Sequence, residues 1–124
     1  MVSLSIPLFT GFGRVSRIKA AEEDLKSAEL AKKQVIDGII FEVKTNYYKA
    51  LEEYENLRVA EKKKKYLQEN YKAIEAKNKE GLATLTEVTD SLTKSLNSAS
   101  EYQQSIFNYI ISLSKLDNSI GGGR

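Results

Sequence analysis

The sequence contains no cysteine, no histidine and no tryptophan, and it has only one proline and seven glycines among 124 residues. Without cysteine, the chain can form neither a disulfide nor a thiolate metal site. Without histidine, it lacks the side chain that most often serves as a general base or metal ligand. Five of the glycines lie near the ends, so the interior holds few residues that break a helix. These absences argue against an enzyme and against a bound metal or cofactor, and they favour long helices.

The chain also lacks a strong net charge and a long apolar run. Its formal charge is +2, which provides no overall field for nucleic acid or an anionic membrane. The lysine run at 61–65 is flanked by glutamates and is typical of a solvated helix face, so no nucleic-acid partner is predicted. The most apolar stretch, VIDGIIFEV, contains two acids and is too short to cross a bilayer as a helix. The opening MVSLSIPLF lacks the basic start of a signal peptide, and we expect none there.

Residues 2–9, VSLSIPLF, alternate between apolar and small or polar side chains, which predicts a β-strand. One face of this strand carries Leu4, Ile6 and Leu8. Pro7 cannot donate a hydrogen bond to a neighbouring strand, so an edge or a strand end is expected. The segment TGFG at 10–13 then predicts a turn.

A long helix is predicted from about residue 14 to residue 79, because apolar residues recur there at spacings of three and four. In its second half this stripe comprises Tyr47, Ala50, Tyr54, Leu57, Ala60, Leu67, Tyr71 and Ile74. Gly38 interrupts the first half at a cost of about 1 kcal/mol relative to alanine. It is either simply tolerated or marks the close approach of another helix.

A second helix is predicted over residues 85–119, followed by a glycine-rich end at 120–124. One apolar row recurs every seven residues: Leu85, Leu92, Ala99, Ile106, Leu113 and Ile120. A second row comprises Val88, Tyr102, Tyr109 and Leu116, with Ser95 as a gap. A sustained seven-residue repeat predicts coiled-coil packing against a partner helix.

The break between the helices, at residues 80–84, has strong local signals. Gly81 suits the left-handed position that ends a helix. Thr84 and Glu87 have the spacing of a capping box, in which the side chain of each residue accepts a hydrogen bond from the backbone N–H of the other. Because the connection is so short, the helices should fold back as an antiparallel hairpin.

The two predicted helices differ greatly in length. At 1.5 Å per residue, the first would be about 100 Å long and the second about 50 Å. The second helix could therefore reach back only to about residue 45, and the apolar stripe of residues 14–44 would have no partner within the chain. The predicted strand also has no second strand to pair with. The chain is therefore expected to be a segment of a longer protein, or to assemble with copies of itself or with another chain.

This order of elements resembles the C-terminal half-repeat of the TolC-type outer-membrane efflux proteins. The matching segments are SLSIPLFTG at 3–11, EVKTNYY at 42–48, KEGLATLTEVTD at 79–90, FNY at 107–109 and LDNSIGGG at 116–123. The chain departs from the family pattern at Ser91, where a small alanine is usual, and at Phe12, where a second glycine is usual.

The resemblance implies a trimeric channel, or a higher oligomer of single-repeat chains, in the bacterial outer membrane and periplasm. Its strands would form a β-barrel and its helices an α-barrel tunnel, through which solutes pass without chemistry. Leu4, Ile6 and Leu8 would face lipid. The tip, formed by Gly81, Leu82, Ala83, Thr84 and Leu85, would dock a periplasmic adaptor protein of an inner-membrane pump. Asp90 and Glu87 would line the narrow aperture behind this tip.

Two alternatives are considered alongside the channel. A soluble coiled-coil scaffold would explain the seven-residue repeats but not residues 2–13. A periplasmic adaptor hairpin would also bring two helices together, but its helices should be similar in length. Partition between membrane and soluble fractions distinguishes the scaffold from the channel.

Overall fold

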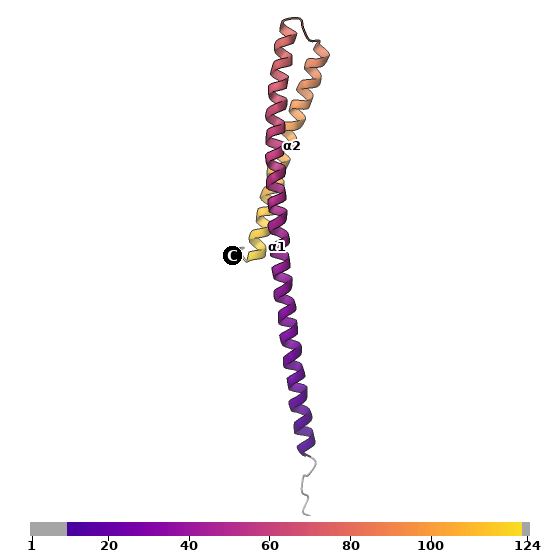
Figure 1. Cartoon of the computed structure of the whole chain (residues 1–124), viewed down its shortest axis with the longest axis vertical. Helices are drawn as coiled ribbons and strands as arrows, with labels where there is room; N and C mark the ends of the chain where they lie inside the picture. Colours follow the sequence, from indigo (N-terminus) through magenta and orange to yellow (C-terminus); the bar gives the residue numbers. More distant parts are fainter. Residues whose placement is uncertain (1–9, 123–124) are drawn as a thin grey trace, which may run out of the picture. The chain divides into compact units, whose positions relative to one another are not determined.

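The computed structural model describes residues 10–122 and contains two α-helices, α1 over Thr10–Lys79 and α2 over Leu85–Ile120 (Figure 1). The mainly helical hairpin expected from the sequence is confirmed. The strand predicted at 2–9, with Leu4, Ile6 and Leu8, lies outside the described residues. Neither described helix has a stretch long and apolar enough to cross a membrane. The chain divides after Phe41 into two units, which are taken in turn.

The turn predicted at residues 10–13 is wrong, because α1 begins at Thr10 and includes Gly11 and Gly13. Glycine in a helix costs only about 1 kcal/mol relative to alanine and meets no steric barrier there. Extending an existing helix adds one backbone hydrogen bond for each residue fixed. Local glycine chemistry therefore did not decide where α1 starts.

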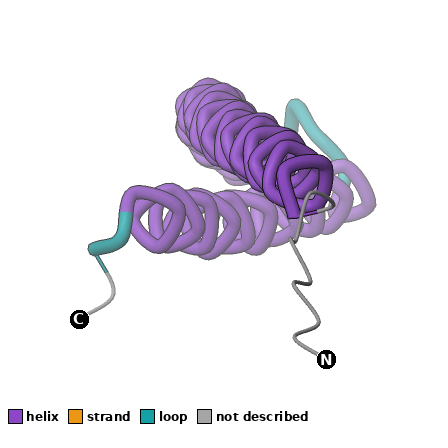
Figure 2. Tube along the Cα trace, turned by 90° about the horizontal axis from the view of Figure 1, so that it is seen from below, coloured by secondary structure: helices purple, strands orange, loops and turns teal. Residues whose placement is uncertain are grey.

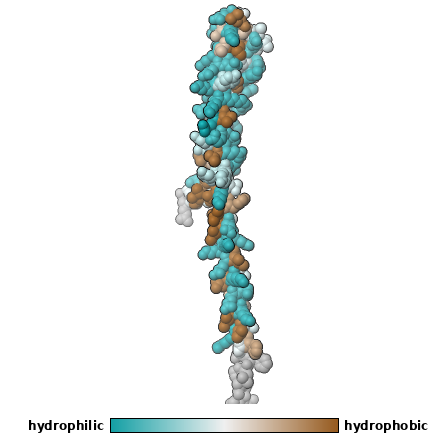
Figure 3. All heavy atoms as spheres, in the orientation of Figure 1, coloured by the Kyte–Doolittle hydropathy of each residue, from teal (hydrophilic) through white to brown (hydrophobic). Residues whose placement is uncertain are grey.

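In the first unit, every side chain of α1 between residues 11 and 41 is exposed. Apolar side chains are interleaved with hydrophilic ones on the surface of this part of α1 (Figure 3). They include Ile18, Leu25 and Ile39, which are 59%, 62% and 51% exposed. A Cβ atom placed on Gly38 would meet nothing within 4 Å. Among the described residues, therefore, no other helix approaches closely enough to require glycine at this position.

In the second unit, α2 packs along the part of α1 that follows residue 41. Figure 1 shows α2 on one side of α1 near the turn and on the other side at its end, and Figure 2 also shows the two helices crossing at an angle. Such crossing is typical of helices with a seven-residue repeat. The α1 face toward α2 follows spacings of three and four through Val43, Asn46, Ala50, Glu53, Leu57, Ala60, Lys64, Leu67, Tyr71, Ile74 and Asn78.

Charged residues within this packed α1 face have specific partners. The ammonium group of Lys49 lies 3.0 Å from an Oε1 atom of Glu53, and this hydrogen bond lowers the pKa of the Glu53 carboxyl group. Lys64 Nζ lies 4.6 Å from the centre of the Tyr102 ring, which is a cation–π contact. These contacts allow charged side chains to occupy positions that the repeat would assign to apolar ones.

The α2 face toward α1 differs from the sequence-based expectation. The second apolar row does face α1, with Val88, Tyr102, Tyr109 and Leu116 half-buried and Ser95 buried at 7% exposure. The first row does not fill the packed face: Ala99 and Ile106 are half-buried, but Leu85, Leu92, Leu113 and Ile120 are exposed. Its place is taken by a serine at every seventh position: Ser91, Ser98, Ser105, Ser112 and Ser119.

These serines satisfy their own hydroxyl groups. Ser91, Ser98 and Ser112 donate to backbone carbonyls one turn earlier in α2, at 2.9, 2.7 and 2.7 Å. No buried side-chain nitrogen or oxygen among the described residues lacks a partner. Because the hydroxyls need nothing from α1, the small side chains allow close approach without an unsatisfied polar group. Small size therefore explains how serine can replace leucine at this contact.

Candidate functional site

The turn between the helices has its backbone fixed by short-range bonds. Gly81 has φ of 76°, in the left-handed region that glycine enters without strain. Its N–H donates to the carbonyl of Asn78 at 2.9 Å, and the N–H of Leu82 donates to that of Lys77 at 2.8 Å. Together these bonds form a Schellman motif, which satisfies carbonyls at the end of α1. The left-handed, helix-ending conformation predicted for Gly81 is confirmed.

A capping box starts α2 on the other side of the turn. The Thr84 hydroxyl accepts from the N–H of Glu87 at 3.3 Å, and the Thr84 N–H donates to a Glu87 carboxylate oxygen at 2.7 Å. The predicted box is therefore confirmed. Donation from the Thr84 backbone lowers the pKa of the Glu87 carboxyl group, with smaller help from the Thr84 hydroxyl and the charge of Lys77.

Asn78 is a turn residue that the sequence analysis missed. Its side-chain Nδ2 donates to the carbonyl of Ala83 at 2.7 Å, which ties the last turn of α1 to the residue before the cap. The sequence signal was available, because an asparagine interrupts the apolar repeat shortly before Gly81. An amide at that position can bond to nearby backbone where an apolar side chain could not.

The turn presents two large apolar side chains to solvent. Leu82 and Leu85 are each 73% exposed, whereas Ala83 is half-buried. The tip residues predicted from the sequence, 81–85, thus form the corner between α1 and α2. The exposed leucine pair lies beside a backbone that five short-range hydrogen bonds hold in place.

Asp90 lies on the exposed face of α2, close to this corner. Its Oδ2 is 2.6 Å from Lys94 Nζ, and the side chains are 61% and 59% exposed. An exposed pair of this kind contributes only about 0.3–0.5 kcal/mol, so the carboxylate can readily exchange partners. Glu87 is three residues earlier and lies on the same helical face, but its carboxylate is held by Thr84. Of the two predicted aperture residues, Asp90 therefore has the carboxylate that can more readily interact with a passing ion.

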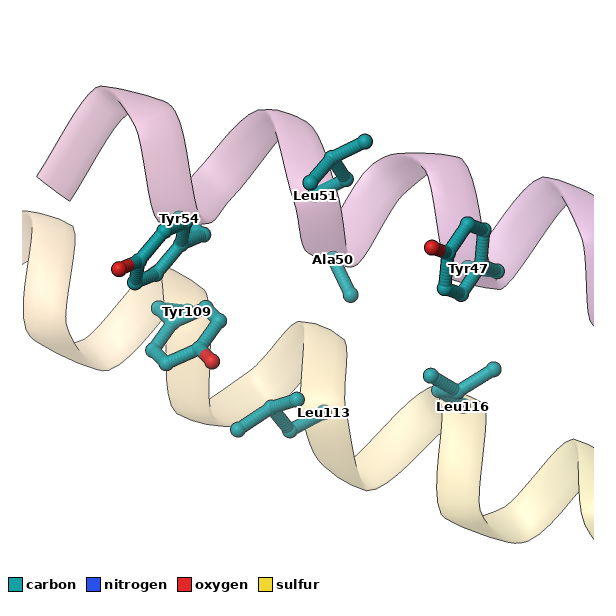
Figure 4. Close-up of a pocket in the computed structure, with 7 residues that line it drawn as sticks. All are labelled: Tyr47, Ala50, Leu51, Tyr54, Tyr109, Leu113 and Leu116. Atoms are coloured by element: carbon teal, nitrogen blue, oxygen red, sulfur yellow. The ribbon is translucent and has the colours of Figure 1, made fainter.

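A groove of about 240 Å³ lies between the helices farther from the turn (Figure 4). It is lined by Tyr47, Ala50, Leu51, Tyr54, Tyr109, Leu113 and Leu116. The rings of Tyr54 and Tyr109 face each other across the helices, with centroids 5.7 Å apart. The lining is apolar apart from tyrosine hydroxyls, and no titratable carboxylate or amine contributes to it. Within residues 10–122, no cluster of three or more acids could hold a metal ion.

Comparison with known protein families decides the identity of this hairpin. The family model described as outer membrane efflux protein matches residues 1–122. The chain belongs to the outer membrane efflux protein family. No curated protein and no solved structure matched the chain. Membership of an efflux family favours a channel segment over an unrelated soluble scaffold or an adaptor hairpin.

Proposed function

We propose that the chain forms part of the wall of a passive efflux channel in the bacterial outer membrane and periplasm. The channel would be a homo-oligomer, a trimer of full-length chains or a higher oligomer of single-repeat chains, and would act without a cofactor. The main support is the efflux-family match over residues 1–122, to which the rigid two-leucine corner adds a contact surface. Leu4, Ile6 and Leu8 would face outer-membrane lipid, as alternating membrane strands require.

The corner of residues 81–85 would dock a periplasmic adaptor protein that connects the channel to an inner-membrane pump. We expect Leu82→Lys to weaken binding of purified adaptor by about tenfold or more, because a charge would enter an apolar contact. Leu96→Lys is the matched control, since Leu96 is also exposed, at 62%, but lies well along α2. Surface plasmon resonance on the intact protein measures both. Equal loss in the two variants would contradict docking at the corner.

Asp90 would line the aperture behind the corner, with copies from several subunits forming a ring of carboxylates. Such rings favour cations, so we expect Asp90→Lys to shift the selectivity of the open channel toward anions. Reversal potentials of the intact protein in planar bilayers, under a salt gradient, measure this shift. Asp117→Lys is the control, because it makes the same charge change near the other end of α2. An unchanged reversal potential in Asp90→Lys would remove Asp90 from the aperture.

A further inference from the structure

The contact between α1 and α2 is flanked by a groove on each of its two sides, and the two grooves differ in chemistry. One side holds the apolar groove between Tyr54 and Leu113, and the mostly exposed row with Leu92 and Leu113 runs along it. The other side holds a second groove, of about 270 Å³, lined by Lys49, Glu53, Asn108, Ile111, Ser112 and Lys115. Ile111 is the one apolar residue among those lining residues. Both grooves lie between the same two helical segments, so the difference comes from the residues alone.

The polar side continues along the hairpin as two rows with a seven-residue spacing. The α1 row is Lys49, Asn56, Lys63, Asn70 and Lys77. The α2 row is Glu87, Lys94, Glu101, Asn108 and Lys115. No member of either row is apolar. Both rows beside the α1 row contain leucine, isoleucine, valine or tyrosine, whereas the α2 row lies between the serine row and a row whose one apolar member is Ile111.

Three observations, at different positions along the hairpin, indicate that the α1 row and the α2 row lie on the same side of the contact between the helices. Lys63 Nζ lies 2.6 Å from Glu101 Oε2 across the two helices. The charge of Lys77 contributes to the lowered pKa of Glu87 near the turn. At the other end, Lys49 and Lys115 line the same groove. Each pair lies fourteen residues from the next along either helix, as regular antiparallel packing requires.

We infer that this polar side is the wall that faces the water-filled passage, an inference that rests on the proposed channel function. A wall that lines a water-filled passage is polar, and the direction of the polar side is set by the proposed aperture residues that continue it. The row also includes Glu87, and its member Lys94 holds Asp90, so the polar side is continuous with the proposed aperture residues. The apolar side, with Leu92 and Leu113, is turned away from the passage.

The absence of cysteine from the chain allows a direct test with single-cysteine variants. Asn108→Cys and Asn56→Cys place a thiol on the polar side, one on each helix. Leu113→Cys and Leu92→Cys place it on the apolar side, at side chains that are 41% and 37% exposed. Each variant of the intact protein is reconstituted in planar bilayers and treated with a membrane-impermeant, sulfonate-bearing methanethiosulfonate. Circular dichroism verifies that all four retain their helices.

We expect stepwise loss of conductance in both polar-side variants, reversed by a reducing agent, and no loss in either apolar-side variant. Block of the apolar-side variants, or conductance that is unchanged in all four, would overturn the assignment of the wall while leaving the channel function intact. An unmodified intact protein that conducts no ions would instead overturn the proposed function, and the inference with it. The two failures are therefore distinguishable.

Discussion

The two parts of α1 share one seven-residue pattern but differ in what covers it. Ile18, Leu25 and Ile39 occupy the same position of the repeat as Ala60 and Ile74. The first three are more than half exposed, whereas Ala60 is only 9% exposed and Ile74 is half-buried. The same position of the repeat is thus exposed before residue 41 and at least half-buried at Ala60 and Ile74, where α2 covers it.

This difference shows that burial in such a rod comes from the partner helix and not from the α1 pattern itself. Apolar area left in water is costly, at about 25 cal/mol per Å². In the proposed assembly, residues 11–41 would require helices from outside this chain. The contrast between covered and uncovered parts can be tested by placing the same change in both.

The largest effect is expected when a charge enters the covered part of α1. Ala60→Glu would force a larger, charged side chain against α2 at a site that is 9% exposed, and we expect a loss of about 3 kcal/mol in the free energy of unfolding. Ala31→Glu makes the same change at an exposed position of the uncovered part and should stay within about 0.5 kcal/mol. Urea unfolding followed by circular dichroism measures both. Similar losses at the two sites would show that residue 31 is also covered.

A smaller effect is expected from enlarging a serine at the contact. Ser98 is 1% exposed, so Ser98→Leu should cost about 2 kcal/mol by forcing the helices apart. Ser98→Ala keeps the small size and should change the free energy of unfolding by about 0.5 kcal/mol or less, because the hydroxyl bonds only to its own helix. Ser100→Leu, at an exposed position, is the control. A stabilising Ser98→Leu would indicate that size does not limit this contact.

The smallest effect is expected at the capping box, and it depends on pH. The folded-state pKa of Glu87 is lowered, so its contribution to stability is present above the ordinary glutamate pKa. It is lost as the pH falls through the lowered folded-state value. Glu87→Gln should therefore reduce the fall in urea midpoint between neutral and acidic pH. Glu80→Gln, an exposed glutamate outside the box, should leave that fall unchanged. Identical pH profiles for wild type and Glu87→Gln would contradict this role.

The hairpin, the left-handed Gly81 and the capping box were all predictable, because each depends on residues close together in sequence. The start of α1 was not, since glycine at 11 and 13 permits a turn but does not impose one. Asn78 was also missed, because an asparagine inside an apolar repeat can bond to backbone in several ways. Local chemistry was therefore a good guide to the corner and a weaker one to the helix end.

The sequence could not determine which row of α2 faces α1. Leu85, Leu92 and Leu113 form the more apolar row, and hydrophobicity alone would place it at the contact. The structure instead places serines there, which a repeat of apolar residues cannot predict. A chain whose helices contact more than one neighbour carries more than one seven-residue row, and only the fold distinguishes them. The predicted tip and aperture residues remain predictions of role, although the positions of the described ones are now known.

The length of the corner also sets the rotational phase of α2. Each residue of a helix advances it by about 100°, so the number of residues between Lys79 and Leu85 determines which row meets α1. One residue more would bring Lys94 and Glu101 toward α1 in place of Ser95 and Tyr102. One residue fewer would bring Leu96 and Ala99 there instead. The length of the corner therefore selects the row of α2 that contacts α1, and a single insertion or deletion there would turn α2 by about 100° and bring a different row to the contact.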